Sequence, residues 1–154
     1  MGLALSNAAR NSTFYKVRNL VLQKDRLMSE TEVLPPDALP GVGKTVGVLA
    51  LQGGVAEHAR MLESLGAQVV LVKSAEQLAN LDALVLPGGE SSTIDRLTRI
   101  FGLRQPLIEA ISGGLPTLGT CAGLIMLSTV INDPAPGQQS LGVLDVSVGR
   151  NAFG

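Results

Sequence analysis

Residues 115–130 read LPTLGTCAGLIMLSTV and contain the only cysteine of the chain, Cys121. The apolar run before it predicts a buried strand over 115–120, and the run after it predicts a helix over 122–130. Gly119 and Gly123 bracket the cysteine, which is the small-x-nucleophile-x-small pattern of a tight strand-to-helix turn. A side chain on such a turn projects from the end of a sheet, and the start of the following helix favours the thiolate. Most lone cysteines are inert and buried, but this setting predicts a nucleophile for acyl transfer through a thioester.

From Thr45 onward, the chain alternates short apolar runs with stretches of helical spacing. Strands are predicted over 46–51, 68–72, 82–86, 115–120 and 141–148, and helices over 55–65, 75–81, 91–101, 106–113 and 122–130. This alternation predicts an α/β fold in which right-handed crossovers connect a mostly parallel sheet. A chain of 154 residues is long enough for one such domain with a sizeable core.

Three turns follow predicted strands and should converge, because ligands of parallel sheets bind beyond the carboxyl ends of the strands. They are Gln52–Gly54, Gly88–Glu90 and the turn at Cys121. Paired glycines let backbone N–H groups face a ligand, and such groups at the start of a helix can form an oxyanion hole. Without Cys121 these would be ordinary βα turns. We expect Ser91 or Ser92 to cap the helix that follows the second turn.

His58 is the only histidine of the chain. A cysteine nucleophile normally needs a base, and histidine is the usual one. His58 lies one turn into the predicted helix over 55–65, where a surface or packing role is expected. We therefore do not predict a pair between His58 and Cys121.

Composition and charge exclude several classes of function. The net charge is −1, which argues against a nucleic acid or a membrane surface as a partner. No apolar stretch approaches the roughly 20 residues of a membrane span. A single cysteine cannot form an internal disulfide, which fits a reducing cytoplasm. No metal site and no cofactor are expected.

Residues 1–44 differ in composition from the rest of the chain. Basic residues dominate the first 28 positions, and prolines follow at 35, 36 and 40. We expect a disordered extension over 1–44, with 1–27 lying upstream of a natural start at Met28, and one domain over 45–154.

Several segments carry a resemblance to a known family. They are VGVLALQG at 46–53, Glu57-His58, LPGGESS at 86–92, LGTCAGL at 118–124, LGVL at 141–144 and RNAFG at 150–154. Together they resemble the glutaminase subunit of pyridoxal 5′-phosphate synthase, from about Lys44 to the last residue. The cysteine elbow and the Pro-Gly-Gly turn are shared by class I glutamine amidotransferases. The combination of Leu-Gln-Gly, Pro-Gly-Gly-Glu-Ser-Ser and Arg-Asn-Ala-Phe-Gly is specific to the vitamin B6 subunit.

The resemblance implies a flavodoxin-like three-layer sandwich of the class I glutamine amidotransferase type. It also implies that Cys121 attacks the carboxamide of L-glutamine, forms a glutamyl thioester and releases ammonia. The implied oxyanion donors are the N–H groups of Gly89 and Ala122. The implied substrate contacts are Gly89, Glu90, Ser91 and Arg150.

The resemblance further implies a partner. Gln52 and Gly53 lie on the turn that rearranges when a synthase subunit docks. Ammonia would pass through a tunnel to that subunit, a (β/α)8 barrel, in a cytoplasmic complex of up to twelve synthases and twelve glutaminases.

The chain departs from the family in one respect. The family's triad ends with a His-x-Glu pair on a later strand, and no such pair follows Cys121. We therefore expect a domain that is incomplete at the C-terminus and a 154-residue form that is inactive. The alternatives are a non-catalytic subunit that docks on the synthase and regulates it, and a glutaminase that serves another acceptor, such as the histidine-pathway or anthranilate enzymes. A third alternative is a cysteine redox or chaperone domain of similar architecture.

Overall fold

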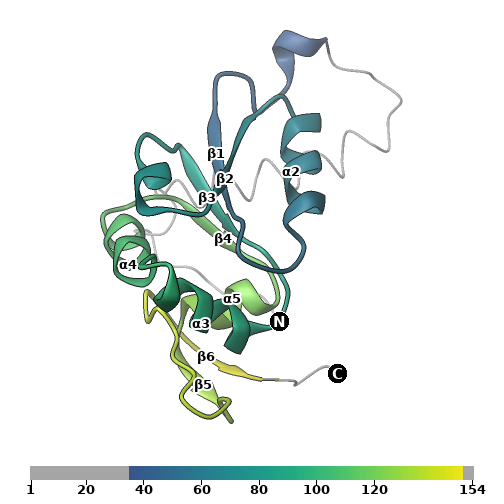
Figure 1. Ribbon diagram of the computed structural model, residues 1–154. Coiled ribbons are helices and arrows are strands. Elements are labelled where there is room, and N and C mark those ends of the chain that lie inside the picture. The colour runs from purple at the N-terminus through teal and green to yellow at the C-terminus, as the bar shows by residue number, and fades with distance from the viewer. Residues whose placement is uncertain (1–34, 151–154) are drawn as a thin grey trace.

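The computed structural model describes residues 35–150 (Figure 1). In chain order the elements are η2 (Pro36–Ala38), β1 (Thr45–Leu49), α2 (Val55–Ser64), β2 (Gln68–Val72), η3 (Ala75–Leu78), β3 (Ala83–Leu86), α3 (Ser91–Ile100), α4 (Arg104–Ser112), β4 (Thr117–Gly119), α5 (Ala122–Leu127), β5 (Ser128–Asn132) and β6 (Leu144–Gly149). The predictions made for 1–34 and for 151–154 lie outside the described residues.

Four strands form a parallel sheet in the order β2-β1-β3-β4. The chain runs outward from β1 to β2 and then returns to place β3 on the other side of β1. In register, Val46 lies opposite both Val69 of β2 and Ala83 of β3. The point at which the strand order reverses therefore lies between β1 and β3. Open α/β sheets bind their ligands at the carboxyl ends of the strands beside such a point.

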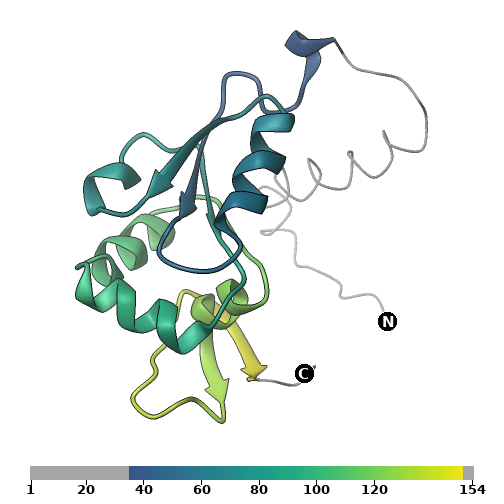
Figure 2. The ribbon, with the colours of Figure 1, turned by 45° about the vertical axis from the view of Figure 1, so that its right-hand side comes forward.

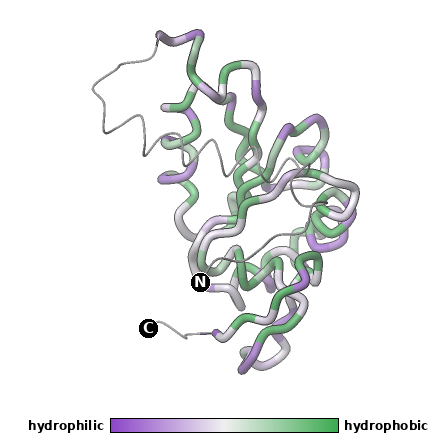
Figure 3. The backbone as a smooth tube through the Cα atoms, turned by 180° about the vertical axis from the view of Figure 1, so that it is seen from behind, coloured by the Kyte–Doolittle hydropathy of each residue, from purple (hydrophilic) through white to green (hydrophobic). Residues whose placement is uncertain are grey.

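Side chains that alternate along the strands build two cores, one on each face of the sheet. The core against α2 contains Val46, Val48, Ala67, Ala83 and Val85, with Val55 and Leu62 of the helix packed on it. The core on the opposite face contains Leu49, Leu84 and Leu86 together with Ile94, Leu107 and Met126 of α3, α4 and α5. Figure 2 shows α2 on one side of the sheet and α3, α4 and α5 on the other, and Figure 3 shows that the strands between them are largely hydrophobic. The structure confirms the predicted three-layer α/β fold.

The predicted helix over 122–130 is wrong in its last three residues. Helix α5 ends at Leu127, and Ser128 leaves the helical conformation with φ −60° and ψ 155°. Residues 128–132 form β5, which pairs in parallel with β6 in a separate two-stranded sheet. Thr129, Val130 and Ile131 are β-branched, and such residues favour strands over helices.

Other element boundaries also differ from the predictions. The helix predicted over 75–81 is the four-residue 3-10 helix η3. Helix α4 begins at Arg104 rather than at Pro106, because a proline is tolerated anywhere in the first turn, where N–H groups have no helical partner. The strand predicted over 141–148 is β6, which begins only at Leu144.

The N-terminal boundary of the packed region lies before residue 45. The N–H of Gly41 donates to the carbonyl of Leu65 at 2.8 Å, and Gly41 is buried. Gly41 therefore packs against Leu65, the residue that follows α2.

An ion pair with a buried carboxylate anchors the loop between β5 and β6. Asp95 of α3 is fully buried, and its Oδ2 accepts from Arg99 Nη2 at 2.7 Å and from the N–H of Gln139 at 3.0 Å. Arg104 Nη2 donates to the carbonyl of Ser140 at 2.8 Å. Arg99 Nη2 also donates to the carbonyl of Gly137 at 3.3 Å. The loop is thus held against α3 and α4 by three charged side chains, and charge-assisted hydrogen bonds are the stronger kind.

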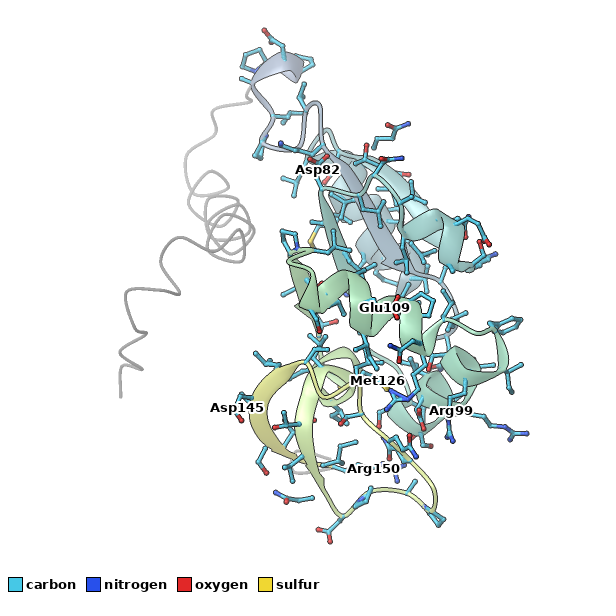
Figure 4. All side chains as sticks on the ribbon, turned by 90° about the vertical axis from the view of Figure 1, so that its left-hand side faces the viewer. Asp82, Arg99, Glu109, Met126, Asp145 and Arg150 are labelled. Atoms are coloured by element: carbon cyan, nitrogen blue, oxygen red, sulfur yellow. The ribbon has the colours of Figure 1, made fainter. Side chains whose placement is uncertain are left out.

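Met126 anchors α5, the helix that follows the cysteine, in the core (Figure 4). We expect Met126→Ala to lower the free energy of unfolding by about 2–5 kcal/mol, because truncating a buried side chain leaves a cavity. Urea denaturation followed by circular dichroism measures this change. Leu124 lies on the same helix and is 40% exposed, so the control Leu124→Ala should cost less than about 1 kcal/mol. Equal effects of the two variants would contradict the packing described.

Candidate active site

Cys121 lies on a strained turn between β4 and α5, as the sequence predicts. Its backbone has φ 48° and ψ −108°, a conformation that residues other than glycine rarely adopt. The residue is exposed, and its thiol is free. Its carbonyl accepts from the N–H groups of Leu124 and Ile125 at 3.0 and 3.2 Å. Backbone strain of this kind persists only where the surroundings hold it, and it is concentrated at active sites.

The two glycines that bracket the cysteine are required by close contacts. A Cβ at Gly119 would lie 2.7 Å from the carbonyl of Gly123. A Cβ at Gly123 would overlap the carbonyl oxygen of Leu86 at the end of β3. Helix α5 can therefore begin directly against the sheet only because both positions lack side chains.

The turns after β1 and β3 meet, as predicted. The N–H of Gly54 donates to the carbonyl of Gly88 at 2.9 Å, and Gln52 Oε1 accepts from the N–H of Glu90 at 2.9 Å. A Cβ at Gly53 would overlap the carbonyl oxygen of Gly88, so the two turns are in direct backbone contact. No described peptide is cis, and the N–H of Gly89 therefore points away from the side on which the Gly88 carbonyl meets Gly54.

The turn after β3 also meets the elbow. A Cβ at Gly88 would lie 3.4 Å from Cβ of Cys121. Ala122 directly follows the cysteine, begins α5 and is 1% exposed. The backbone of the turn after β3 and the first residue of α5 thus both lie beside the nucleophile candidate.

Glu90, and neither Ser91 nor Ser92, caps α3, so the predicted serine cap is wrong. Its carboxylate accepts from the N–H groups of Ser92 at 3.3 Å and Thr93 at 2.7 Å, and from Ser92 Oγ. The Ser92 hydroxyl, followed by the donors of Thr93 and the N–H of Ser92, lowers the pKa of Glu90 to about 2, although partial burial opposes this. Glu90 is therefore ionised across the physiological range.

Arg150 reaches the same carboxylate from the end of β6. Its Nη2 lies 2.8 Å from Glu90 Oε1, and its side chain is 23% exposed. Ser91 is buried beside this pair, and its Oγ accepts from Gln138 Nε2 at 2.9 Å. Arg150, Glu90 and Ser91 thus lie together in the structure. Gln138 was missed, because it lies in the loop between β5 and β6 and only the three-dimensional arrangement places it there.

His58 faces the elbow. Its Nε2 lies 3.0 Å from Oγ1 of Thr120, the residue before Cys121, and its side chain is half-buried. Sequence reasoning placed His58 on the surface or in the packing of the first helix. Its spacing within that helix gave no signal of a contact with a residue 62 positions away.

A metal site, a membrane-spanning helix and a cavity are three other features that would bear on the function of the described residues. Among residues 35–150, no three or more His, Cys, Asp or Glu side chains are grouped so that they could hold a metal ion. None of the helices in this part of the chain has both the length and the apolar character needed to cross a membrane. A cavity of about 300 Å³ is lined by Arg104, Thr129, Ile131, Pro134, Gln138, Gln139 and Ser140. It lies beside the loop between β5 and β6, and Cys121 is not among its lining residues.

The contact at Gly123 gives a prediction about stability. We expect Gly123→Ala to lower the free energy of unfolding by more than about 2 kcal/mol, because the new methyl group meets a backbone oxygen that cannot rotate away. Urea denaturation measures the effect. The matched control is Gly54→Ala, whose Cβ would meet only Glu57 Oε2 at 3.5 Å. A Gly123→Ala protein as stable as this control would rule out the described approach of α5 to β3.

The cap at Glu90 gives a prediction about pH. Ser92→Ala should raise the pKa of Glu90 from about 2 towards 4.5, which carboxyl NMR titration measures. A lowered pKa in the folded state adds stability above about pH 4.5, and this stability is lost as the pH falls towards 2. The stability lost over that window should therefore be smaller in Ser92→Ala than in the parent. Ser112→Ala, at an exposed helix end, is the control and should titrate like the parent.

Comparison with known proteins agrees with this geometry. Residues 48–154 match the SNO glutamine amidotransferase family. The chain is 54% identical over 116 residues to a protein of Acidothermus cellulolyticus named pyridoxal 5′-phosphate synthase subunit PdxT. The aligned residues are 75% of this chain and 56% of that protein. A PdxT of Kineococcus radiotolerans is 58% identical over 110 residues, which are 71% of this chain and 53% of that protein. The chain thus spans about half the length of the curated relatives it matches.

Solved structures support the same fold. A crystal structure of a glutamine amidotransferase is similar with a TM-score of 0.65 and 46% identity, covering 71% of this chain and 58% of that one. A putative peptidase E protein of Listeria monocytogenes is similar with a TM-score of 0.59 and 21% identity, covering 78% of this chain and 69% of that one. This second similarity supports the fold alone. The family match covers more than half of the sequence and includes the cysteine elbow, the capped turn of Glu90 and Arg150. The chain belongs to the SNO glutamine amidotransferase family.

Proposed function

We propose that this chain carries the nucleophile and substrate-binding part of a glutaminase, which hydrolyses L-glutamine to L-glutamate and ammonia for the synthesis of pyridoxal 5′-phosphate. The observation that carries the proposal is the exposed, strained Cys121, placed where the turns after β1 and β3 converge. A buried structural cysteine has no need of this conformation. The relatives are named as subunits of pyridoxal 5′-phosphate synthase, and these names support the use of the ammonia in that synthesis.

The chemistry follows from the surroundings of Cys121. Its sulfur attacks the carboxamide carbon of glutamine, and the thiol proton leaves with the departing nitrogen as ammonia. Water then hydrolyses the glutamyl thioester and restores the thiol. The N–H groups of Gly89 and Ala122 would hold the oxyanion formed in each step, because Gly89 directly follows Gly88, which lies against Cys121, and Ala122 directly follows the nucleophile. Such donors contribute about 3–4 kcal/mol each where measured.

Recognition of the substrate in this proposal rests on the charged pair of Glu90 and Arg150 at the start of α3. Glu90 is ionised and Arg150 is cationic, so the two groups complement the α-ammonium and the α-carboxylate of a free amino acid. Gly89 and Ser91 flank the glutamate and complete the set of substrate contacts. Gln138 keeps Ser91 in place through a hydrogen bond of 2.9 Å.

The partner in this proposal is a synthase subunit of (β/α)8-barrel form, in a cytoplasmic complex of up to twelve copies of each subunit. Gln52 and Gly53 lie on the turn that would respond to docking. Their contacts support this role, because a shift of that turn must move the Gly88 carbonyl and the N–H of Glu90. The rival proposals are docking without catalysis and a different ammonia acceptor.

Labelling with a diazoketone analogue of glutamine tests the proposal. We expect one adduct per chain, on Cys121, detected by intact mass spectrometry and absent from Cys121→Ser. Arg150→Gln should slow this labelling about tenfold or more, because a hydrogen bond to a charged group is lost, while labelling by iodoacetamide stays unchanged. Arg96→Gln is the matched control, because Arg96 is exposed on α3. Equal labelling of the parent and Arg150→Gln by the analogue would contradict the role of Arg150.

The same preparation tests turnover. The 154 residues include no His-x-Glu pair after Cys121, so this polypeptide should be labelled without releasing measurable ammonia from glutamine. Ammonia release that is abolished by Cys121→Ser would show that another group supplies the base. A chain that resists the analogue yet binds the synthase would favour the docking role.

A further inference from the structure

The contact between His58 and Thr120 joins two parts of the molecule that are distant in sequence. His58 lies in the first turn of α2, immediately after the turn that contains Gln52 and Gly53. Thr120 lies between β4 and Cys121. The 3.0 Å separation of Nε2 and Oγ1 is a hydrogen bond in either tautomer of the imidazole, because the threonine hydroxyl can donate or accept. The contact therefore does not depend on the protonation state of the ring.

Thr120 is held from three directions. Its N–H donates to the carbonyl of Leu86 at 3.1 Å, and its own carbonyl accepts from the N–H of Gly123 at 2.8 Å. The third hold is the side-chain contact with His58. The two backbone hydrogen bonds connect Thr120 to β3 and to α5. Only the contact with His58 comes from α2, on the other face of the sheet.

We propose that His58 is a positioning residue that holds the strained backbone of Cys121 through Thr120. The inference rests on the proposed function, since it concerns the same nucleophile. A positive φ at a residue with a side chain needs support from its neighbours, and His58 supplies that support from α2. Because α2 begins where the turn of Gln52 ends, His58 also carries any displacement of that turn to the nucleophile.

The position of the imidazole distinguishes this role from that of a general base. Its Nε2 faces the hydroxyl of Thr120, so it acts on the residue beside the nucleophile. Replacement by a side chain that keeps a polar atom at the Nε2 position should therefore preserve the function. Glutamine reaches that position with its amide, whereas leucine has a similar size and no polar atom.

Alkylation of Cys121 by iodoacetamide in the full 154-residue chain tests the inference. The chain has one cysteine, so every adduct reports on Cys121. We expect His58→Leu to lower the second-order rate constant about fivefold, the ratio that corresponds to one typical side-chain contact. His58→Gln should stay within about twofold of the parent. Arg60→Gln, at an exposed position of the same helix, is the control and should leave the rate unchanged.

A double-mutant cycle separates the contact from a general loosening of the fold. Thr120→Val should lower the rate about as much as His58→Leu, and the double variant should be no slower than either one. Thr120→Ser keeps the hydroxyl and should react like the parent. If His58→Leu fails to fold by circular dichroism, the comparison of Thr120→Val with Thr120→Ser decides the matter. Additive effects, or equal rates for His58→Leu and the parent, overturn the inference.

Two outcomes of the alkylation experiment distinguish the positioning role of His58 from the proposed role of Cys121. A parent chain whose Cys121 does not react with iodoacetamide contradicts the nucleophile itself. A reactive Cys121 that does not respond to His58→Leu leaves the nucleophile intact and removes only the positioning role.

Discussion

The approach of α5 to the end of β3 is the constraint on which the site depends. Gly123 lies so close to the carbonyl of Leu86 that no side chain fits between helix and sheet. This contact fixes where α5 begins, and hence forces the chain to turn sharply at Cys121 with a positive φ. The buried Met126, one turn further along the same helix, anchors α5 in the core. The position of Cys121 therefore follows from packing alone.

The rest of the site consists of short connections that contact one another's backbones. The turn of Gly53 lies directly on the carbonyl of Gly88, and the turn of Gly88 lies on Cys121. Glycine at these positions removes the side chains that would separate the turns. A fold with one strand-order reversal brings three such turns to the same edge of the sheet, and this explains how residues from 52 to 150 meet there.

The sequence carried enough information to predict the four strands of the parallel sheet, the elbow at Cys121 and the convergence of the glycine turns. These features depend on local patterns, such as apolar runs and glycine spacing, which do not require knowledge of distant neighbours. The extent of α5 was overestimated, because Thr129 and Val130 fit an apolar helical pattern as well as the strand that pairing with β6 selects. The contacts of His58 and Gln138 could not be predicted, because each depends on a residue more than forty positions away.

The cap of α3 has a consequence for ligand binding. Glu90 is held by Ser92 and Thr93 in the free protein, so its side chain has already lost much of its rotational freedom on folding. An ordinary surface glutamate gives up this freedom only when it binds. A cation that meets Glu90 therefore encounters a carboxylate with a fixed direction and a permanent charge. The conformational entropy lost on binding is correspondingly smaller, and the helix cap acts as a form of preorganisation.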